Sequence, residues 1–488
     1  MRILFVSSEA FPLIKTGGLA DVSGSLPAAL REVGADVRLL IPAYPAVLQK
    51  LVNQREVATV DNLPSVGSIS LVLGEIAETG LPVLAIVCPN LYSRSGNPYL
   101  DANGNDWPDN PLRFGILSLV AAILSDEYSP LTDWIPDIVH CNDWQTGLTP
   151  AYMRYKAASR PIMHQAKSVL SIHNLAFQGN FHPDWVPQLG LPAASYQVNG
   201  VEYYGQMSFL KAGVFFADSL STVSPTYARE IQTAEYGFGM QGLLSQRSQE
   251  IHGILNGIDL DEWNPENDPH LASTYNATKL AAKKSVKAAL QKRLGLSLDA
   301  TAPLLGVVSR LTHQKGLDMF LEVAEPFLQQ GCQIALLGSG DPYLENGFNN
   351  LARNYRSQVS VNIGYNEPLS HQIMAGSDIF IMPSRFEPCG LNQMYGLRYG
   401  TPPVVTNTGG LADSVTDTTP QSLKNNTATG FVMSGPHAGA LTTSINKALE
   451  HYREDKIWGK IQRNGMQRDL GWHKSASEYL ALYEQLLK

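Results

Sequence analysis

The sequence predicts an α/β protein built from two similar halves, and three observations lead to this prediction. Apolar strand-like segments alternate with helical patterns along the chain, which is typical of parallel sheets. Several of these segments end in polar clusters, and open α/β sheets bind ligands at that edge. The motif TGGLAD occurs twice, at Thr16–Asp21 and at Thr408–Asp413, each time just after an apolar segment.

The first half starts with an expected strand at Arg2–Ser7, a glycine-rich loop and a helix from about Asp21 to Glu32. Asp21 is typical of a helix N-cap, and Gly34 is typical of the residue that closes a helix. Further strands are expected at Val37–Ile41, Val83–Cys88, Ile138–Cys141, Ser168–Ile172 and Leu220–Val223.

The second half repeats this alternation. A strand at Leu304–Ser309 precedes a loop and a helix that begins near Gly316. Later strands are expected at Gln333–Leu337, Ser360–Ile363, Ile379–Pro383 and Pro403–Thr406, and a last helix from about Ser475 to Lys488.

Two irregular segments lie between these elements. Residues 92–111 are rich in Gly, Asn, Asp and Pro, which predicts a functional loop over a cleft. Residues 264–302 indicate an interdomain connection with one basic helix. We expect its lysines to form a solvated face, and these are Lys279, Lys283, Lys284 and Lys287.

Composition narrows the class of protein. A chain of 488 residues that is 44% hydrophobic predicts two or three domains with large cores. The net charge of −8 argues against a nucleic-acid partner. No segment approaches the roughly 18 apolar residues of a membrane span, and the N-terminus is not typical of a signal peptide. Four cysteines without a CxxC spacing favour free thiols, so we expect a soluble cytoplasmic protein.

Each TGGLAD copy predicts a Gly-Gly turn before a helix start. Free backbone N–H groups and the helix dipole favour a phosphate or a polar sugar there. Lys15 precedes the first copy, and Arg310 and Lys315 precede the second. We therefore expect the two halves to present matching loops to one cationic cleft, which suits an anionic donor such as a nucleoside diphosphate sugar.

Five motifs stand at the predicted strand ends: KTGGLAD, HCNDWQTGL, HNLAFQG, SRLTHQKG and SRFEPCGL. In this order they resemble the bacterial glycogen synthases and plant-type starch synthases over nearly the whole chain. The resemblance implies the GT-B architecture, in which two Rossmann-like domains face each other across a deep cleft. The domains would span residues 1–255, on the glucan acceptor side, and 256–470, on the nucleotide-sugar side. A C-terminal helix at 471–488 would cross back to the first domain.

The resemblance also implies an activity. The family transfers glucose from ADP-glucose, sometimes UDP-glucose, to the non-reducing end of an α-1,4-glucan and retains the anomeric configuration. The glucan would be glycogen, amylose or a maltooligosaccharide. The choice between ADP and UDP, the oligomeric state, and a soluble or granule-bound location stay open.

Three residues of the second half would act on the donor. Arg310 and Lys315 are the two leaving-group cations by resemblance, and preorganised cations stabilise the charge that builds on the diphosphate. Glu387 would hold the 3- and 4-hydroxyls of the glucose, with an attacking nucleophile as the alternative role. The backbone amides after Glu387 would meet the phosphate, and they belong to Cys389, Gly390 and Leu391.

Residues of the first half would act on the sugar and the acceptor. By resemblance, His173 bonds the glucose 6-hydroxyl, and its carbonyl faces the anomeric carbon. Asp143 would orient groups near the acceptor, or merely cap the following helix. Lys15 would contact the donor, and Gly17 and Gly18 would let the backbone approach it closely. Asp21 is a further candidate substrate-binding residue, with the helix N-cap as its alternative role.

Three further donor contacts follow from the resemblance. Tyr365 would stack on the nucleobase, Asn256 would contact the donor at the hinge, and Tyr92 would lie in the cleft near the donor. A plain packing role is the alternative for each of them.

The expected mechanism is a front-face transfer without a covalent intermediate, in which the departing phosphate oxygen takes the acceptor's proton. A glucosyl adduct on Glu387 or Asp143 is the competing expectation. Because protein cations and helix ends can neutralise the diphosphate, we predict no metal ion and no cofactor. The rival functions are a nucleotide-sugar epimerase on the same fold and a non-catalytic glucan-binding protein.

Overall fold

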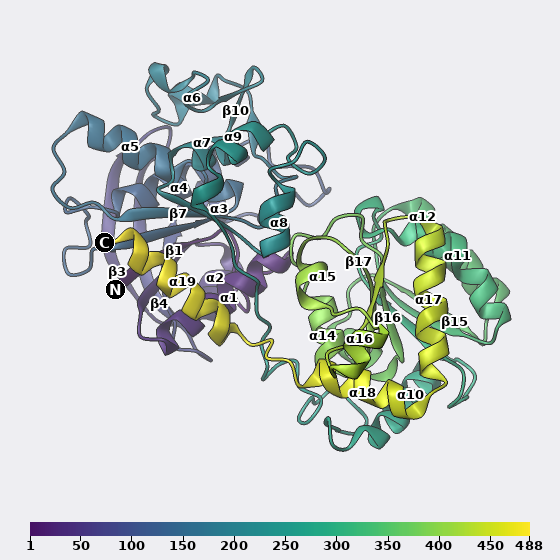
Figure 1. Cartoon of the computed structure of the whole chain (residues 1–488). Helices are drawn as coiled ribbons and strands as arrows, with labels where there is room; N and C mark the ends of the chain where they lie inside the picture. Colours follow the sequence, from purple (N-terminus) through teal and green to yellow (C-terminus); the bar gives the residue numbers. More distant parts are fainter. The chain divides into compact units, whose positions relative to one another are not determined.

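The computed structural model describes residues 1–488 and divides into two compact units. Unit 1 comprises Met1–Gly257 and Trp472–Lys488, and unit 2 comprises Ile258–Gly471. The chain thus leaves unit 1 after Gly257 and returns to it in the last helix, which is yellow in Figure 1. Asn256 belongs to unit 1, although the sequence placed it at the start of the second domain.

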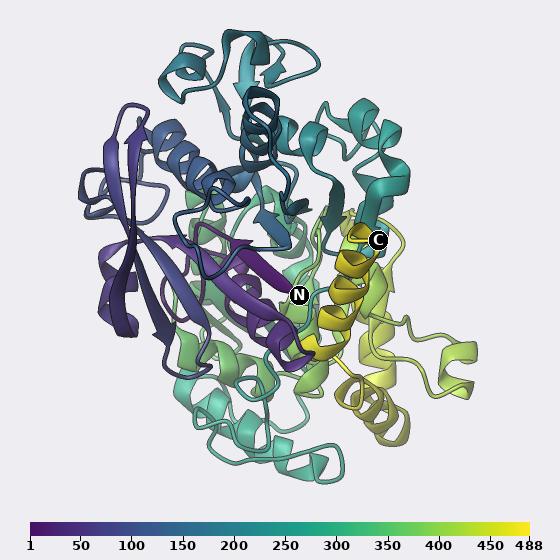
Figure 2. The same ribbon diagram turned by 90° about the vertical axis from the view of Figure 1, so that its left-hand side faces the viewer.

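Unit 1 is built on a nine-stranded sheet with the order β12-β11-β7-β6-β1-β2-β5-β4-β3. The strands from β12 to β5 are parallel, and β4 and β3 pair antiparallel at the edge. The bounds are β1 Arg2–Val6, β2 Asp36–Pro42, β3 Leu51–Leu63, β4 Gly67–Ile76, β5 Pro82–Val87, β6 Ile138–Asn142, β7 Lys167–Ile172, β11 Ser219–Thr222 and β12 Ile251–Gly253. Figure 2 shows β3 and β4 as a long hairpin that the sequence analysis did not predict.

Helices cover this sheet, and a small second sheet has the order β8-β10-β9, with β8 Asn180–Phe181, β9 Glu202–Tyr203 and β10 Gln206–Ser208. The helices are α1 Gly18–Glu32, α2 Pro45–Lys50, α3 Pro89–Tyr92, α4 Asn110–Ile123, α5 Thr149–Ser159, α6 Trp185–Gln188, α7 Phe209–Phe216, α8 Pro225–Glu230, α9 Gln241–Gln246 and α19 Trp472–Leu486. Helix α19 packs against α1, and the Tyr483 hydroxyl lies 2.7 Å from Nδ1 of His140 on β6.

Helix α1 begins three residues earlier than predicted. Gly17 is its N-cap in extended conformation, with φ −158° and ψ −167°, and no side chain caps the helix. Asp21 therefore lies in the first turn, where a carboxylate interacts favourably with the helix dipole. The predicted N-cap role of Asp21 is wrong.

Unit 2 contains a six-stranded parallel sheet with the order β15-β14-β13-β16-β17-β18. Its strands are β13 Leu304–Val308, β14 Gln333–Gly338, β15 Val359–Ile363, β16 Ile379–Met382, β17 Pro403–Thr406 and β18 Phe431–Met433. Its helices are α10 Lys283–Leu294, α11 Leu317–Gln329, α12 Pro342–Asn354, α13 Glu367–Gly376, α14 Asn392–Arg398, α15 Gly409–Ser414, α16 Pro420–Lys424, α17 Ala438–Tyr452 and α18 Asp455–Met466. Buried side chains such as Val307, Phe320 and Phe327 form its core.

The segment 264–302 is part of unit 2 and not a connection between domains. Lys283 and Lys287 on α10 are buried, with 5% and 4% exposure. Lys283 Nζ donates to Thr401 Oγ1 at 2.7 Å, and Lys287 forms an ion pair of 2.7 Å with Asp378. Burial lowers the pKa of Lys283 to about 7.

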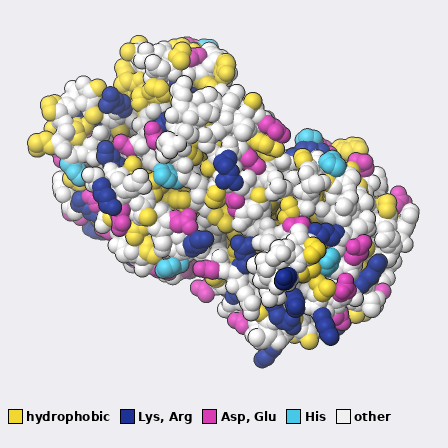
Figure 3. Space-filling model, in the orientation of Figure 1, with side chains coloured by type: hydrophobic (Ala, Val, Ile, Leu, Met, Phe, Trp, Pro, Cys, Tyr) yellow, Lys and Arg dark blue, Asp and Glu magenta, His cyan; other side chains and the backbone are white.

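The predicted solvated face is therefore wrong for these two lysines, because helix α10 turns them into the interior of unit 2. Lys279 and Lys284 are exposed, as predicted. Figure 3 shows Lys and Arg side chains gathered on one face of unit 2, near α10 and α18.

All four cysteines are free and buried, as the absence of a CxxC spacing predicted. None of the helices combines the length and the apolar character that crossing a bilayer requires.

Candidate active site

Three neighbouring strands of unit 1 bring several predicted residues to one edge of the sheet. Strands β1, β6 and β7 are adjacent and parallel. The loop that carries Lys15 and Gly18 follows β1, Asp143 follows β6, and His173 follows β7. We call these four residues the unit 1 cluster.

Glu9, which the sequence analysis did not single out, organises the glycine-rich loop of this cluster. It is 3% exposed, and its carboxylate accepts hydrogen bonds from Thr16 N at 2.6 Å, from Thr16 Oγ1 and from Gly17 N at 3.4 Å. The Tyr99 hydroxyl donates to Glu9 Oε1 at 2.7 Å. Burial raises the pKa of Glu9, and these hydrogen bonds act in the opposite direction. The position of Glu9 in the polar cluster directly after β1 was the available signal.

The bonds to Glu9 change the expected role of the loop. Two of its N–H groups, those of Thr16 and Gly17, are already used within the protein, so the prediction that they are free is wrong for them. A Cβ added to Gly17 or Gly18 would meet no atom within 4 Å, so packing does not require glycine at either position. Lys15 Nζ lies 2.7 Å from Asp21 Oδ1. The surface over these glycines is open to a ligand.

The Asp143 carboxylate binds the backbone directly after the neighbouring strand β7. Its Oδ1 accepts hydrogen bonds from His173 N at 2.7 Å and from Asn174 N at 3.3 Å, and it does not cap the following turn. Burial raises the pKa of Asp143 to about 7, against the effect of these two bonds. Its φ of 56° is unusual for a residue other than glycine, and such strain is concentrated at functional sites.

His173 carries its ring hydrogen on Nε2. The Asn142 amide NH₂ donates to the carbonyls of Val6 and His140, so Asn142 Oδ1 faces His173 and accepts from Nε2 at 2.9 Å. Burial lowers the pKa of His173 to about 4. The ring is therefore neutral near pH 7, and Nδ1 has a lone pair that can accept a hydrogen bond from a sugar hydroxyl.

The structure does not place the Tyr92 side chain at the site. Tyr92 is 1% exposed, and its hydroxyl donates to the Arg113 carbonyl at 2.6 Å. The packing alternative holds for this residue. Within residues 92–111, Arg94 forms an ion pair of 2.6 Å with Asp109, and the Tyr99 hydroxyl bond to Glu9 ties the segment to the loop after β1.

Asn256 follows β12 near the end of the first part of unit 1. It is 7% exposed, and its Oδ1 has no hydrogen-bond partner within the protein. A buried acceptor without a donor is unfavourable, and a bound ligand is one way to satisfy it.

In unit 2, the ends of the adjacent strands β13 and β16 bring together the predicted charged residues. Lys315 Nζ lies 2.6 Å from Glu387 Oε2, and Ser384 Oγ donates to the same oxygen at 2.9 Å. Glu387 Oε1 accepts no hydrogen bond within the protein. Arg310 is exposed and has no ion pair. We call Arg310, Lys315 and Glu387 the unit 2 cluster.

The second TGGLAD copy packs against the backbone of the loop that carries Glu387, so it is not an open loop. Gly409 and Gly410 are buried. A Cβ on Gly409 would lie 1.9 Å from the Glu387 carbonyl oxygen, and a Cβ on Gly410 would lie 2.2 Å from the Cys389 carbonyl oxygen. Gly410 N–H donates to the carbonyls of Glu387 and Pro388. The prediction of two matching open loops is therefore wrong for the second copy, because its glycines are required by close packing.

Arg385 is a second residue that sequence reasoning missed. Its guanidinium makes two parallel bonds of 2.7 Å to the Asp318 carboxylate and one to the His313 carbonyl. It thereby fastens the loop of Glu387 to the loop of Lys315. Its place in the SRFEPCGL motif was the only available signal.

The remaining predicted residues of unit 2 lie on the same edge or next to it. Gly390 has a φ of 72°, which favours glycine, and Leu391 precedes α14. Cys389 is buried with 5% exposure. Tyr365 follows β15, is 76% exposed, and its hydroxyl donates to Glu367 Oε2. An exposed aromatic ring at this edge is suited to stacking on a planar ligand.

Two family models cover most of the chain. One described as the starch synthase catalytic domain matches residues 2–246, and one described as glycosyl transferases group 1 matches residues 291–465. A glycogen synthase of Nitrosomonas eutropha is 51% identical over 491 residues, which is 100% of this chain and 97% of the relative. A glycogen synthase of Dechloromonas aromatica is 52% identical over 488 residues, with 100% and 99% covered.

Solved structures agree with these matches. The catalytic domain of starch synthase IV from Arabidopsis thaliana, bound to ADP and acarbose, is 31% identical with a TM-score of 0.88, and 99% of both chains is covered. Sucrose-phosphate synthase from Thermosynechococcus elongatus, at 16% identity and a TM-score of 0.58 over 99% of this chain and 98% of that one, shares the fold alone. The predicted α/β fold of the GT-B class is confirmed.

Proposed function

We propose, because this chain belongs to the glycogen synthase and starch synthase family of glycosyltransferases, that it transfers glucose from ADP-glucose to the non-reducing end of an α-1,4-glucan with retention of configuration. The observation that carries the proposal is the unit 2 cluster, in which Lys315 and Glu387 are paired and Arg310, on the same loop as Lys315, has no ion pair. The ADP and acarbose bound to the Arabidopsis relative support ADP-glucose and a glucan as substrates.

Arg310 and Lys315 stabilise the leaving diphosphate in this proposal. Negative charge builds on the diphosphate as the glycosidic bond breaks, and cations already in position lower the barrier. Arg310 is available because no carboxylate neutralises it, and its guanidinium can bind two phosphate oxygens at once. These protein cations make a metal ion at the diphosphate unnecessary.

Glu387 of unit 2 and His173 of unit 1 each offer an acceptor for a sugar hydroxyl. Glu387 Oε2 is occupied by Lys315 and Ser384, which leaves Oε1 to accept from a sugar hydroxyl. His173 Nδ1 accepts from a second hydroxyl, since its Nε2–H is bonded to Asn142. Both acceptors are held by neighbours before the substrate arrives, so little ordering is needed at the moment of reaction.

We further propose a front-face transfer without a covalent intermediate. Glu387 is paired with a cation and accepts a hydroxyl hydrogen bond, which makes its Oε2 a poor nucleophile. Asp143 uses Oδ1 to bind two backbone N–H groups, and burial raises its pKa to about 7, so much of it is protonated near neutral pH. Mass spectrometry of enzyme quenched during turnover should find no glucosyl adduct on either residue.

The test of the function uses ADP-glucose and UDP-glucose, each with and without a maltooligosaccharide. We expect extended glucan chains with ADP-glucose, and strong loss of extension in Arg310→Ala. A changed sugar on the nucleotide without any glucan would indicate an epimerase. Binding of the glucan without turnover of either donor would indicate a glucan-binding protein. We place the reaction in the cytoplasm, where buried free thiols stay reduced.

A further inference from the structure

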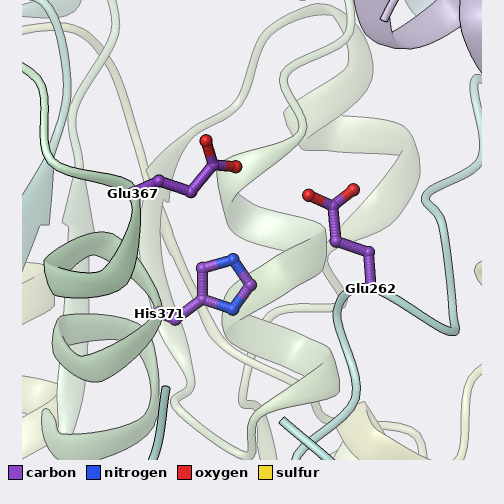
Figure 4. Close-up of side chains that lie close together, drawn as sticks. All are labelled: Glu262, Glu367 and His371. Atoms are coloured by element: carbon purple, nitrogen blue, oxygen red, sulfur yellow. The ribbon is translucent and has the colours of Figure 1, made fainter. Parts of the chain in front are cut away.

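We propose that Glu262, Glu367 and His371 of unit 2 form a binding site for a divalent transition-metal ion such as Zn²⁺. Each residue offers one ligand atom, and these atoms lie within 4.8 Å of one another. Figure 4 shows the two carboxylates and one ring nitrogen of His371 directed toward a common space. None of the three residues belongs to the unit 2 cluster, and none was predicted from the sequence.

The buried ring nitrogen of His371 is the observation that points to a ligand. His371 is 2% exposed, and its Nε2 has no hydrogen-bond partner within the protein. Its Nδ1 lies 2.8 Å from Asp268 Oδ2, and a carboxylate oxygen fixes the ring hydrogen on Nδ1. Nε2 then directs a lone pair toward two carboxylates. A cation in this space would give the His371 Nε2 lone pair the partner that it lacks within the protein, and the two carboxylates beside it would neutralise the charge of the ion.

The surroundings of His371 match those of a metal-binding histidine. Such a histidine commonly donates its second ring N–H to a carboxylate, which fixes the orientation of the ring. Asp268 takes this part, is 3% exposed and also accepts from the Tyr399 hydroxyl at 2.5 Å. The Trp263 ring stacks on the imidazole with centroids 3.8 Å apart and 13° between the planes. The ring is thus held in place before any ion binds.

The backbone explains why the three ligands meet. Glu367 and His371 are four residues apart on α13, so they lie on the same face of the helix. Glu262 lies in the segment that opens unit 2 after Gly257, next to Trp263, whose ring covers His371. A bound ion would therefore tie the first residues of unit 2 to α13.

The ligand set selects the class of ion. An imidazole nitrogen with two carboxylate oxygens suits Zn²⁺ and similar ions better than Mg²⁺ or Ca²⁺, which prefer oxygen alone. Zn²⁺ binds such atoms at about 2.0–2.2 Å, so the flexible Glu262 and Glu367 side chains must close slightly around it, and water would fill the fourth position. The site is separate from the diphosphate cations, but it would make the expectation of no metal ion wrong for the chain as a whole.

The test titrates the full chain, first treated with EDTA, with Zn²⁺ in a calorimeter. We expect one saturable site, and at least about tenfold weaker binding in Glu262→Gln and in Glu367→Gln. Glu266→Gln is the matched control, because Glu266 is an exposed acid of the same segment that bonds Asn276 instead. This variant should bind Zn²⁺ as the unchanged chain does.

Two readouts independent of activity complete the test. Saturating Zn²⁺ should raise the Tm of the unchanged chain by several degrees and leave that of the two Gln variants unchanged. Co²⁺ should give visible absorption bands that both variants lose. The glutamate variants carry the test, since replacing His371 would disturb the Trp263 stack. No saturable binding, or equal binding in the unchanged chain and in both variants, would overturn the proposal.

Discussion

Lys315 and Glu387 form an ion pair of 2.6 Å although they lie 72 positions apart in the chain. Their side chains are only 16% and 7% exposed. Each residue therefore sets the electrostatic environment of the other, and the pair links the loop after β13 to the loop after β16. A substitution at either position acts on stability as well as on catalysis.

Replacing Lys315 by Ala should lower glucosyl transfer by orders of magnitude, because the leaving diphosphate loses a cation. It should also lower the free energy of unfolding by about 1–3 kcal/mol, since Glu387 keeps a nearly buried charge with only the Ser384 hydroxyl to bond it. A double-mutant cycle with Glu387→Gln, measured by chemical denaturation, checks this. Independent, additive effects of the two substitutions on stability would show that the pair contributes no coupling.

Asp143→Asn should remove a pH dependence of stability. The pKa of Asp143 is about 7 in the folded protein and 3.8 when the carboxyl is exposed to water in the unfolded chain, so the folded state binds more protons between these values. Its contribution to stability is present at low pH and is lost as the pH rises through 7. The variant should therefore gain stability relative to the unchanged chain between pH 4 and pH 7, by at most about 1.4 kcal/mol per pH unit.

The measurement is the difference in free energy of unfolding between the two proteins at each pH. His173 and His140, whose pKa values burial lowers to about 4 and about 3, contribute a dependence of the opposite sign in both proteins. Their contribution cancels in the difference. A difference that stays constant from pH 4 to pH 8 would contradict the prediction.

The two TGGLAD copies should respond differently to the same substitution. Gly410→Ala should destabilise unit 2 by about 1–3 kcal/mol or more, because the new Cβ would lie 2.2 Å from the Cys389 carbonyl oxygen. Gly18→Ala should leave stability unchanged or raise it slightly, because space is open there and Ala favours helix. It should instead lower kcat/KM for the donor. Thermal unfolding and steady-state kinetics of both variants distinguish the two roles, and equal losses of stability would refute the distinction.

Lys283→Ala should lower the free energy of unfolding by about 2–4 kcal/mol, because the side chain is buried and its Nζ bonds Thr401 and two backbone carbonyls. The neighbouring Lys284→Ala, at an exposed position, should change it by less than about 0.5 kcal/mol. Urea denaturation of the two variants provides the comparison. Equal effects would restore the sequence-based prediction of a solvated lysine face.

Buried parallel strands were predictable because they are continuous apolar segments bounded by polar residues. Strand β17 at Pro403–Thr406 was located without error, and β1 within one residue. The hairpin of β3 and β4 was missed because β3 lies at the sheet edge and exposes most of its residues, so its sequence lacks an apolar stretch.

The candidate site was predicted unevenly for a similar reason. His173, Asp143, Lys315 and Glu387 stand at strand ends within recognisable motifs, and the structure places them in the two clusters. Glu9 and Arg385 act through loop contacts, and no local pattern distinguishes such a residue from a surface charge. For Tyr92 the prediction failed in the other direction. Its motif suggested a ligand contact, but the fold buries the ring.

The sequence by itself determined the alternation of buried strands with helices, the family and the charged residues at the strand ends, because periodicity and motifs are local properties of the chain. Only the tertiary structure decided which residues are buried and what each contacts. Gly18 has open space around it, whereas Gly410 is closely packed. Lys283 is buried although the adjacent Lys284 is exposed, and Glu262 lies close to His371. The reason is physical: burial, pKa and ligand geometry depend on neighbours that are distant in sequence, and identical local motifs can meet different neighbours.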